Sequence, residues 1–138
     1  MNRKTTLAFG FMDAPFESAR TTTFFRLLDV ATRRGYQINV FAYEGAVGMA
    51  FAHQKPHANA VHGRDVEAEG HPLPKDWLAA LIVQADAHRG KLLDWVNCGL
   101  CVDERGVGEF IAGVRRGSPA DFWKMTSESD NTLVIGTR

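Results

Sequence analysis

The sequence is poor in cysteine and carries no net charge. Only two of its 138 residues are cysteines, and sixteen Lys and Arg residues balance sixteen Asp and Glu residues. A chain without net charge has no overall field to attract nucleic acid or an anionic membrane, so we expect neither as a direct partner. Its N-terminal apolar stretch is broken by Gly10 and stops at Asp13, which is too short for a signal peptide or a membrane span. These absences predict a cytoplasmic protein.

Internal repeats and low-complexity segments are also absent. The length is that of one ordinary domain, long enough to bury a core without disulfides or structural metal. We therefore expect residues 1–138 to form a single domain.

Strand-like and helix-like segments alternate along the chain. Strands are predicted at residues 5–11, 37–43, 91–97 and 132–136, and helices at 19–34, 76–90 and 118–129, with short helices at 44–52 and 108–116. The helix that follows Ser118 should begin with a capping box formed with Asp121, and Pro119 suits its first turn. This alternation predicts a flavodoxin-like α/β three-layer sandwich with a mainly parallel sheet.

A long stretch without periodicity interrupts this pattern. Residues 53–75 contain three prolines, two glycines and four histidines, His53, His57, His62 and His71. Irregular loops of this length within a domain are usually functional, interfacial or mobile. We expect an irregular excursion that is mobile unless another subunit holds it.

The two cysteines lie in "VNCGLCVDERG", directly after a predicted strand. Open α/β sheets place ligands and chemistry at the carboxyl ends of their strands, which favours a functional role for Cys98. A helix that starts there would stabilise a thiolate. If the predicted strands, numbered along the chain, were ordered 2-1-3-4 in the sheet, the first and third strands would be neighbours. The loop after the first strand, which contains Met12, Asp13 and Phe16, would then flank Cys98.

Charged neighbours act on a thiol at this position in opposite directions. Asp103 and Glu104 would raise its pKa, while Arg105 would lower it. We regard Asp13, Gly99 and Arg105 as candidate binding residues beside the thiol.

Metal and cofactor motifs are incomplete in this sequence. A single Cys-x-x-Cys pair lacks the second pair of ligands of a structural zinc site, and the histidines follow no finger spacing. The segment "EGAVGMA" lacks the third glycine of a dinucleotide fingerprint and the Lys-Ser/Thr of a phosphate loop. We expect neither metal nor cofactor.

Three segments together carry a resemblance to a known family. "YEGAVGMAFAHQ", "CGLCVDERGV" and "GVRRGSPADFWKMTSESDNTLVIG" make the chain similar to the DsrE/DsrF-like family of sulfur-relay proteins over nearly its whole length. In that family a functional cysteine follows the strand and a glycine stands eight residues later, as Cys98 and Gly106 do here. The resemblance implies that Cys98 accepts sulfane sulfur as a persulfide.

The same resemblance has implications for partners and assembly. It implies a sulfur donor and an acceptor protein, such as a rhodanese-like donor or a small TusA-like carrier, and a homo-oligomer, a trimer or a hexamer. Cys101 corresponds to a cysteine that only some members carry, and its role stays open between a resolving thiol and an auxiliary thiol.

The chemistry of sulfur transfer fits these residues independently. A carrier needs one accessible thiol of lowered pKa on a rigid element and no cofactor. A second thiol close by could instead convert the persulfide to a disulfide and release sulfide. Two alternatives therefore stand beside the sulfur carrier. One is a dithiol-disulfide oxidoreductase or redox sensor that uses Cys98 and Cys101, and the other is a non-catalytic assembly subunit.

Overall fold

A computed structural model describes residues 3–58, 63–64, 70–87 and 92–136. It contains a five-stranded sheet in which every pair of neighbouring strands is parallel. The strands are β1 (Thr6–Phe11), β2 (Gln37–Ala42), β3 (Leu93–Cys98), β4 (Val114–Gly117) and β5 (Asn131–Ile135). The helices are α1 (Arg20–Arg33), the 3-10 helix η1 (Glu44–Ala50), α2 (Pro74–Asp86), α3 (Gly99–Arg105) and α4 (Pro119–Glu128). The predicted α/β class and parallel sheet are confirmed.

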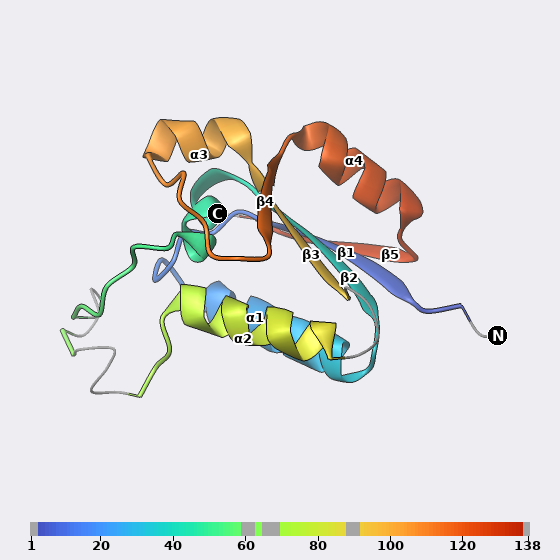
Figure 1. The fold of residues 1–138 in the computed structure, drawn as a ribbon, viewed down its shortest axis with the longest axis horizontal. Helices are drawn as coiled ribbons and strands as arrows, with labels where there is room; N and C mark the ends of the chain where they lie inside the picture. Colours follow the sequence, from blue (N-terminus) through green and yellow to red (C-terminus); the bar gives the residue numbers. More distant parts are fainter. Residues whose placement is uncertain (1–2, 59–62, 65–69, 88–91, 137–138) are drawn as a thin grey trace.

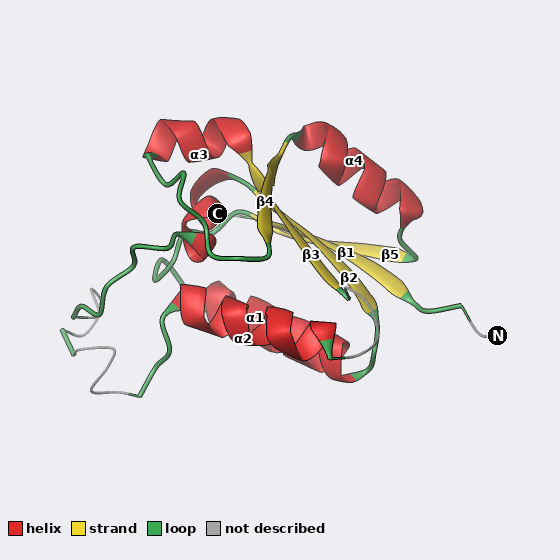
Figure 2. Ribbon diagram, in the orientation of Figure 1, coloured by secondary structure: helices red, strands yellow, loops and turns green. Residues whose placement is uncertain are grey.

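Helices cover both faces of the sheet, which gives three layers. Helices α1 and α2 lie side by side on one face, and α3 and α4 lie on the other (Figures 1 and 2). The larger apolar core is formed between the sheet and α1 and α2, and it is centred on Phe24, Phe25, Leu78 and Trp95. A smaller core under α3 and α4 includes Phe41, Val96, Met125 and both cysteines.

The strand order is β4-β3-β2-β1-β5. The order 2-1-3-4 considered from the sequence is wrong, because β2 pairs with both β1 and β3 and separates them. The loop after β1 therefore does not adjoin the end of β3. Hydrophobic periodicity indicates which residues are buried, but it carries no information on which strand lies next to which.

The predicted short helix at 108–116 is also wrong, since no helix lies between α3 and β4. Val114–Gly117 forms the edge strand β4, which pairs with Trp95–Cys98 of β3. Gly113 adopts φ +91, a conformation outside the helical range, and Phe110 forms an isolated antiparallel bridge with Phe51. These two features exclude a helix there.

The capping box at the start of α4 is confirmed. Ser118 Oγ accepts a hydrogen bond from the Ala120 N–H at 3.3 Å, and an Asp121 carboxylate oxygen accepts one from the Ser118 N–H at 2.8 Å. Pro119 occupies the first helical position, where its missing N–H has no cost.

The long excursion is anchored at its base by one side chain. The Gln54 side-chain amide donates to the carbonyl oxygens of Gly48 at 2.7 Å and Met49 at 2.9 Å, and its oxygen accepts from the Lys75 N–H at 3.0 Å. Gln54 thus links the end of η1 to the start of α2. The excursion ends where α2 begins, at Pro74, and its predicted mobility stays a prediction.

No helix among the described residues is both long enough and apolar enough to cross a membrane.

Candidate functional site

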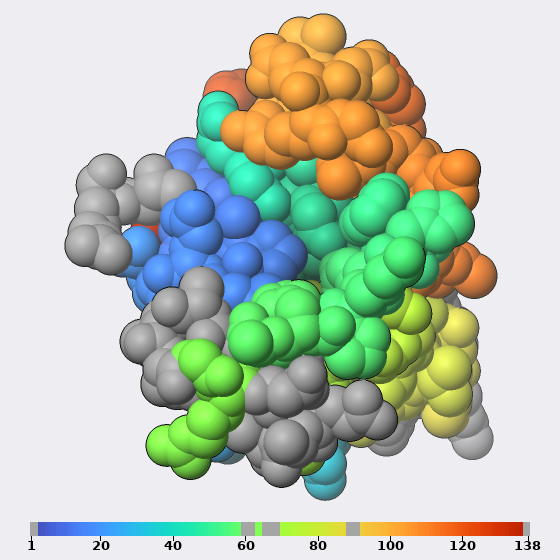
Figure 3. Space-filling model, turned by 90° about the vertical axis from the view of Figure 1, so that its left-hand side faces the viewer, coloured from blue at the N-terminus to red at the C-terminus, as the bar shows by residue number. Residues whose placement is uncertain are grey.

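Cys98 is the last residue of β3 and directly precedes α3. It is level with Gly117 of β4, at the carboxyl edge of the sheet, where open parallel sheets place their chemistry. This edge faces the viewer in Figure 3, where the chain after β1 (blue), the η1 region (turquoise) and the α3 region (orange) meet. The predicted position of Cys98 at a strand end therefore agrees with the structure.

The Cys98 side chain is nearly buried, with 7% of its surface exposed. It belongs to the smaller core together with Val96 and Val102. This differs from the accessible thiol expected from the sequence, because Cys98 packs into the smaller core.

Cys101 lies one turn further along α3 and is also nearly buried, with 9% of its surface exposed. Its sulfur atom accepts a hydrogen bond from the backbone N–H of Glu44 at 3.1 Å. Glu44 is the first residue of η1 and adopts φ +51, which is uncommon for a residue other than glycine. The turn that directs this N–H at Cys101 is thus held in an unfavourable backbone conformation.

The surroundings of Cys101 favour the protonated thiol. Burial raises the pKa of Cys101 above its ordinary value, and the neighbouring Cys98 and the negative charge of Glu44 raise it further. The hydrogen bond from the Glu44 N–H opposes these effects only in part. Both cysteines are free thiols, and both belong to the smaller core.

Arg105, a candidate from the sequence, lies on the Cys101 side of the site. Its guanidinium donates to Glu44 at 3.1 Å and to the backbone oxygen of Cys101 at 3.3 Å, and it lies 3.5 Å from Glu104. Arg105 therefore neutralises acidic groups around the second thiol.

Gly99, the second candidate, lies against an arginine that the sequence analysis did not single out. A Cβ atom at position 99 would lie 2.6 Å from Nε of Arg116, so the absence of a side chain makes room for this guanidinium. Arg116 donates to both carboxylate oxygens of Asp103, at 2.8 and 2.7 Å. The interpretation of residues 108–116 as a helix concealed Arg116. Had "VRRG" been assigned to a strand beside β3, Arg116 would have been placed level with Asn97, next to Cys98.

Asp13, the third candidate, is buried in the loop between β1 and α1. It accepts hydrogen bonds from Ser18 Oγ and from Nε of Arg20, both at 2.7 Å. Since β2 separates its strand from β3, Asp13 is not brought together with Cys98. Its contacts indicate a role in fixing the turn between β1 and α1.

Two hollows lie along α3. One, of about 540 Å³, is lined by Met12, Ala14, Glu17, Glu44, Gly45 and Arg105. The other, of about 460 Å³, is lined by Phe51, His53, Val102, Asp103, Gly106, Gly108 and Glu109. The first hollow is bounded on the α3 side by Arg105, which contacts Glu44, and the second by Asp103, which contacts Arg116. The carboxyl edge therefore offers space for a partner on either side of this helix.

The histidines of the excursion do not form a common site in the described part of the chain. His53 is paired with Glu109, and the ring of His57 contacts Phe16 with 4.6 Å between centroids. His62 lies outside the described residues. Across the residues that the structure describes, no group of three or more His, Cys, Asp or Glu side chains could hold a metal ion.

The fold and this edge define a class: a parallel, three-layer α/β protein with a thiol at the carboxyl end of an inner strand. The sequence model of the DsrE/DsrF-like family matches residues 6–135, and the chain belongs to this family. Among solved structures, the YchN protein of E. coli superimposes with a TM-score of 0.72, at 18% sequence identity, over 96% of this chain and all of that one. That likeness shows a shared fold. No curated protein matches the sequence.

Proposed function

We propose that the protein is a cytoplasmic sulfur carrier, a sulfurtransferase that holds sulfane sulfur as a persulfide on Cys98 and passes it to a thiol of a partner protein. The observation that carries this proposal is the unequal surroundings of the two thiols. Cys98 ends a strand next to the residue that packs on the Arg116 guanidinium, whereas burial and Glu44 keep Cys101 protonated. Membership of a family of sulfur-relay proteins supports the same reading.

The reaction needs only thiols. The Cys98 thiolate attacks the outer sulfur of a donor persulfide, a new S–S bond forms on Cys98, and the donor's S–S bond breaks so that the donor leaves as a thiolate. The acceptor thiolate then attacks the outer sulfur of the Cys98 persulfide, and Cys98 leaves as a thiolate. One sulfur atom moves in each step without net oxidation, so no cofactor takes part.

The raised pKa of Cys101 protects this intermediate. A Cys101 thiolate could attack the inner sulfur of the persulfide, form a disulfide with Cys98 and release hydrosulfide. At neutral pH a thiol of raised pKa is almost entirely protonated and is a poor nucleophile. The arrangement therefore favours storage of sulfur over its release.

The closeness of the two thiols favours one second candidate, a dithiol-disulfide oxidoreductase or redox sensor. Cys98 is near enough to raise the pKa of Cys101, and a local shift of α3 could bring the sulfur atoms into bonding distance. In that reaction the pair loses two electrons and two protons to an external disulfide.

Partners and assembly follow from the family and not from the site geometry. We infer a protein donor and a protein acceptor, such as a rhodanese-like donor or a small TusA-like carrier, in a sulfur oxidation or thiolation relay. We also infer a homo-oligomer, a trimer or a hexamer, which the exposed apolar side chains of the edge strand β5 support.

Intact-mass measurement after exposure of the reduced protein to polysulfide tests the proposal. The wild-type protein should gain one sulfur atom that reductant removes. Cys98→Ser should not load, since no other thiol ends a strand, and Cys101→Ser should still load. Loss of two hydrogens would favour the redox candidate, and a wild-type protein that gains nothing would contradict the proposal.

A further inference from the structure

The guanidinium of Arg116 packs on the residue that directly follows Cys98. A Cβ atom on Gly99 would lie 2.6, 2.8 and 2.9 Å from Nε, Cζ and Nη2 of Arg116, so this group covers the first residue of α3. The β3–β4 register places Arg116 level with Asn97 and Gly117 level with Cys98, so the backbone of Arg116 lies beside the last residues of β3. The long arginine side chain thus reaches the carboxyl end of β3, where the Cys98 sulfur lies.

Asp103 fixes the guanidinium in this place. Its two oxygen atoms accept from Nη1 and Nη2 of Arg116 at 2.8 and 2.7 Å, a bidentate arrangement that sets both the position and the plane of the group. The hydrogen bond and the charge of Asp103 raise the pKa of Arg116, and the charge of Cys98 raises it as well. A Cys98 anion and the Arg116 cation therefore attract each other.

The other charged and titratable groups around this end of β3 have different partners. Arg105 is paired with Glu44, and both act around Cys101. Tyr43 precedes Glu44, and its pKa is raised by burial and by that carboxylate. Arg116 is thus the cation that the fold brings to the residue after Cys98.

We propose that Arg116 is a positioning residue that stabilises the anionic forms of Cys98, the thiolate before sulfur transfer and the persulfide anion after it, and that Asp103 holds it there. This inference rests on the proposed function, because it assigns the group that serves the same Cys98 chemistry. It also explains why position 99 is glycine, since a side chain there would displace the guanidinium from the thiol.

The pH profile of Cys98 alkylation by iodoacetamide tests the proposal without any sulfur donor. In a Cys101→Ser background, mass spectrometry reports Cys98 alone. Arg116→Gln should raise the midpoint of the profile by about one pH unit or more, because the neighbouring cation is lost. Below both midpoints, alkylation should then be about tenfold slower, in proportion to the thiolate fraction.

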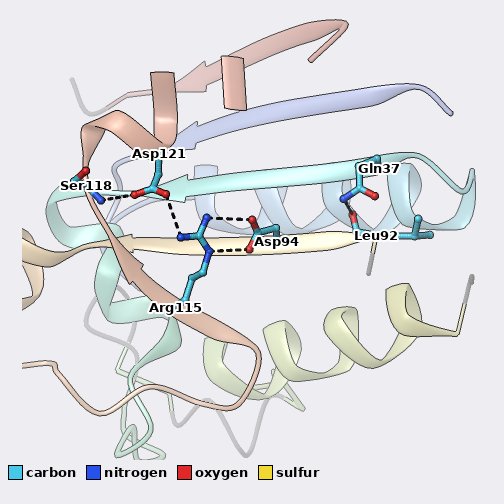
Figure 4. A network of polar contacts seen from close by, with 6 residues as sticks. All are labelled: Gln37, Leu92, Asp94, Arg115, Ser118 and Asp121. Atoms are coloured by element: carbon cyan, nitrogen blue, oxygen red, sulfur yellow. Dashed lines mark hydrogen bonds and ion pairs between the residues drawn. The ribbon is translucent and has the colours of Figure 1, made fainter. Parts of the chain in front are cut away.

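Three further variants separate position from charge. Arg116→Lys keeps the charge but not the bidentate bond, so its midpoint should lie between those of the parent and Arg116→Gln. Gly99→Ala moves the guanidinium without removing it and should also raise the midpoint. Arg115→Gln is the matched control, because Arg115 is equally exposed on the same strand but is bound to Asp94 and Asp121 (Figure 4). Its midpoint should stay at the parent value.

The alkylation experiment and the sulfur-loading experiment test two different claims, so their failures can be distinguished. An unchanged midpoint in Arg116→Gln, or an equal shift in Arg115→Gln, would overturn the role of Arg116 even if the parent loads sulfur. A shifted midpoint in a parent that never loads sulfur would leave Arg116 beside the thiol but would remove the carrier function. Should Arg116→Gln fail to fold, the lysine and Gly99→Ala variants decide the question.

Discussion

At the scale of single residues, the two cysteines differ more in their surroundings than in their spacing along the chain. Both are nearly buried in the same small core. Cys101 accepts a hydrogen bond from the Glu44 N–H of η1, and the negative charge of Glu44 raises its pKa. A pair of similar thiols would exchange roles readily, whereas here burial and the Glu44 charge favour the protonated form of Cys101. The surroundings of the two thiols are thus set by residues of η1 and β4, which the Cys-x-x-Cys spacing does not reveal.

The raised pKa of Cys101 makes stability depend on pH in the alkaline range. Because the folded state holds the Cys101 proton more tightly than the unfolded state, this group's contribution is fully present below its ordinary pKa of 9.0. It is lost as the pH rises through the higher folded-state pKa. We expect the free energy of unfolding of the wild type, relative to Cys101→Ser, to fall as the pH rises above about 9.

Urea unfolding of the two proteins between pH 6 and pH 10.5 measures this difference. Below pH 8 the difference between them should stay constant, which provides the internal control. A difference that is constant over the whole range would mean that burial does not raise the pKa of Cys101.

At the scale of elements, the N-terminal cap of α4 should contribute measurably to stability. Ser118→Ala removes the side-chain acceptor of the Ala120 N–H and should lower the free energy of unfolding by about 1 kcal/mol. Ser127→Ala is the control. Ser127 lies exposed in the same helix, where its hydroxyl donates to the Trp123 carbonyl, and its replacement should change stability by less than about 0.5 kcal/mol. Equal effects in urea unfolding would show that the cap is not what stabilises the helix.

The elements that bury a periodic apolar face could be predicted from the sequence. Helix α1 buries Phe24, Leu28 and Ala31, and α2 buries Leu78, Leu81 and Ile82, so the burial of their side chains matches the helical period. Strands β1, β2 and β3 are inner strands, and their apolar runs made them visible.

Edge strand β4 could not be found in this way. None of its four residues is buried, so its sequence "VRRG" has no apolar pattern that would indicate a strand. The same reason hid Arg116, the part of the candidate site that the sequence analysis missed. Cys98 could be predicted because it ends an inner strand whose apolar run is visible in the sequence. Which strands lie beside β3 is decided by pairing between distant segments, and that information is absent from the local pattern.

At the scale of the whole molecule, the two edges of the sheet differ in character. The β4 edge carries Arg115 and Arg116, both in ion pairs, which discourages strand addition there. The β5 edge exposes Leu133 and Val134, and a hollow of about 390 Å³ lies between β5 and α1. Exposed apolar groups at an unpaired edge are typical of a surface that another chain covers.

This asymmetry yields a prediction for the homo-oligomer. The mass in solution, measured by light scattering during size-exclusion chromatography, should be three or six times 15.3 kDa. Leu133→Lys, which places a charge in the β5 hollow, should shift the protein toward smaller species. Val83→Lys, at an exposed position of α2, serves as the control and should leave the mass unchanged. A monomeric wild type, or equal dissociation by both substitutions, would exclude assembly through this edge.

The Gln54 contacts have a practical consequence for this fold. Since one glutamine ties the end of η1 to the start of α2, the ends of the intervening segment stay together whatever its length. Lengthening a loop whose ends are already held together costs only about 0.6 kcal/mol for each doubling. A guest sequence, such as a fluorescent reporter, spliced between Gln54 and Lys75 should leave the sheet and the cysteines undisturbed.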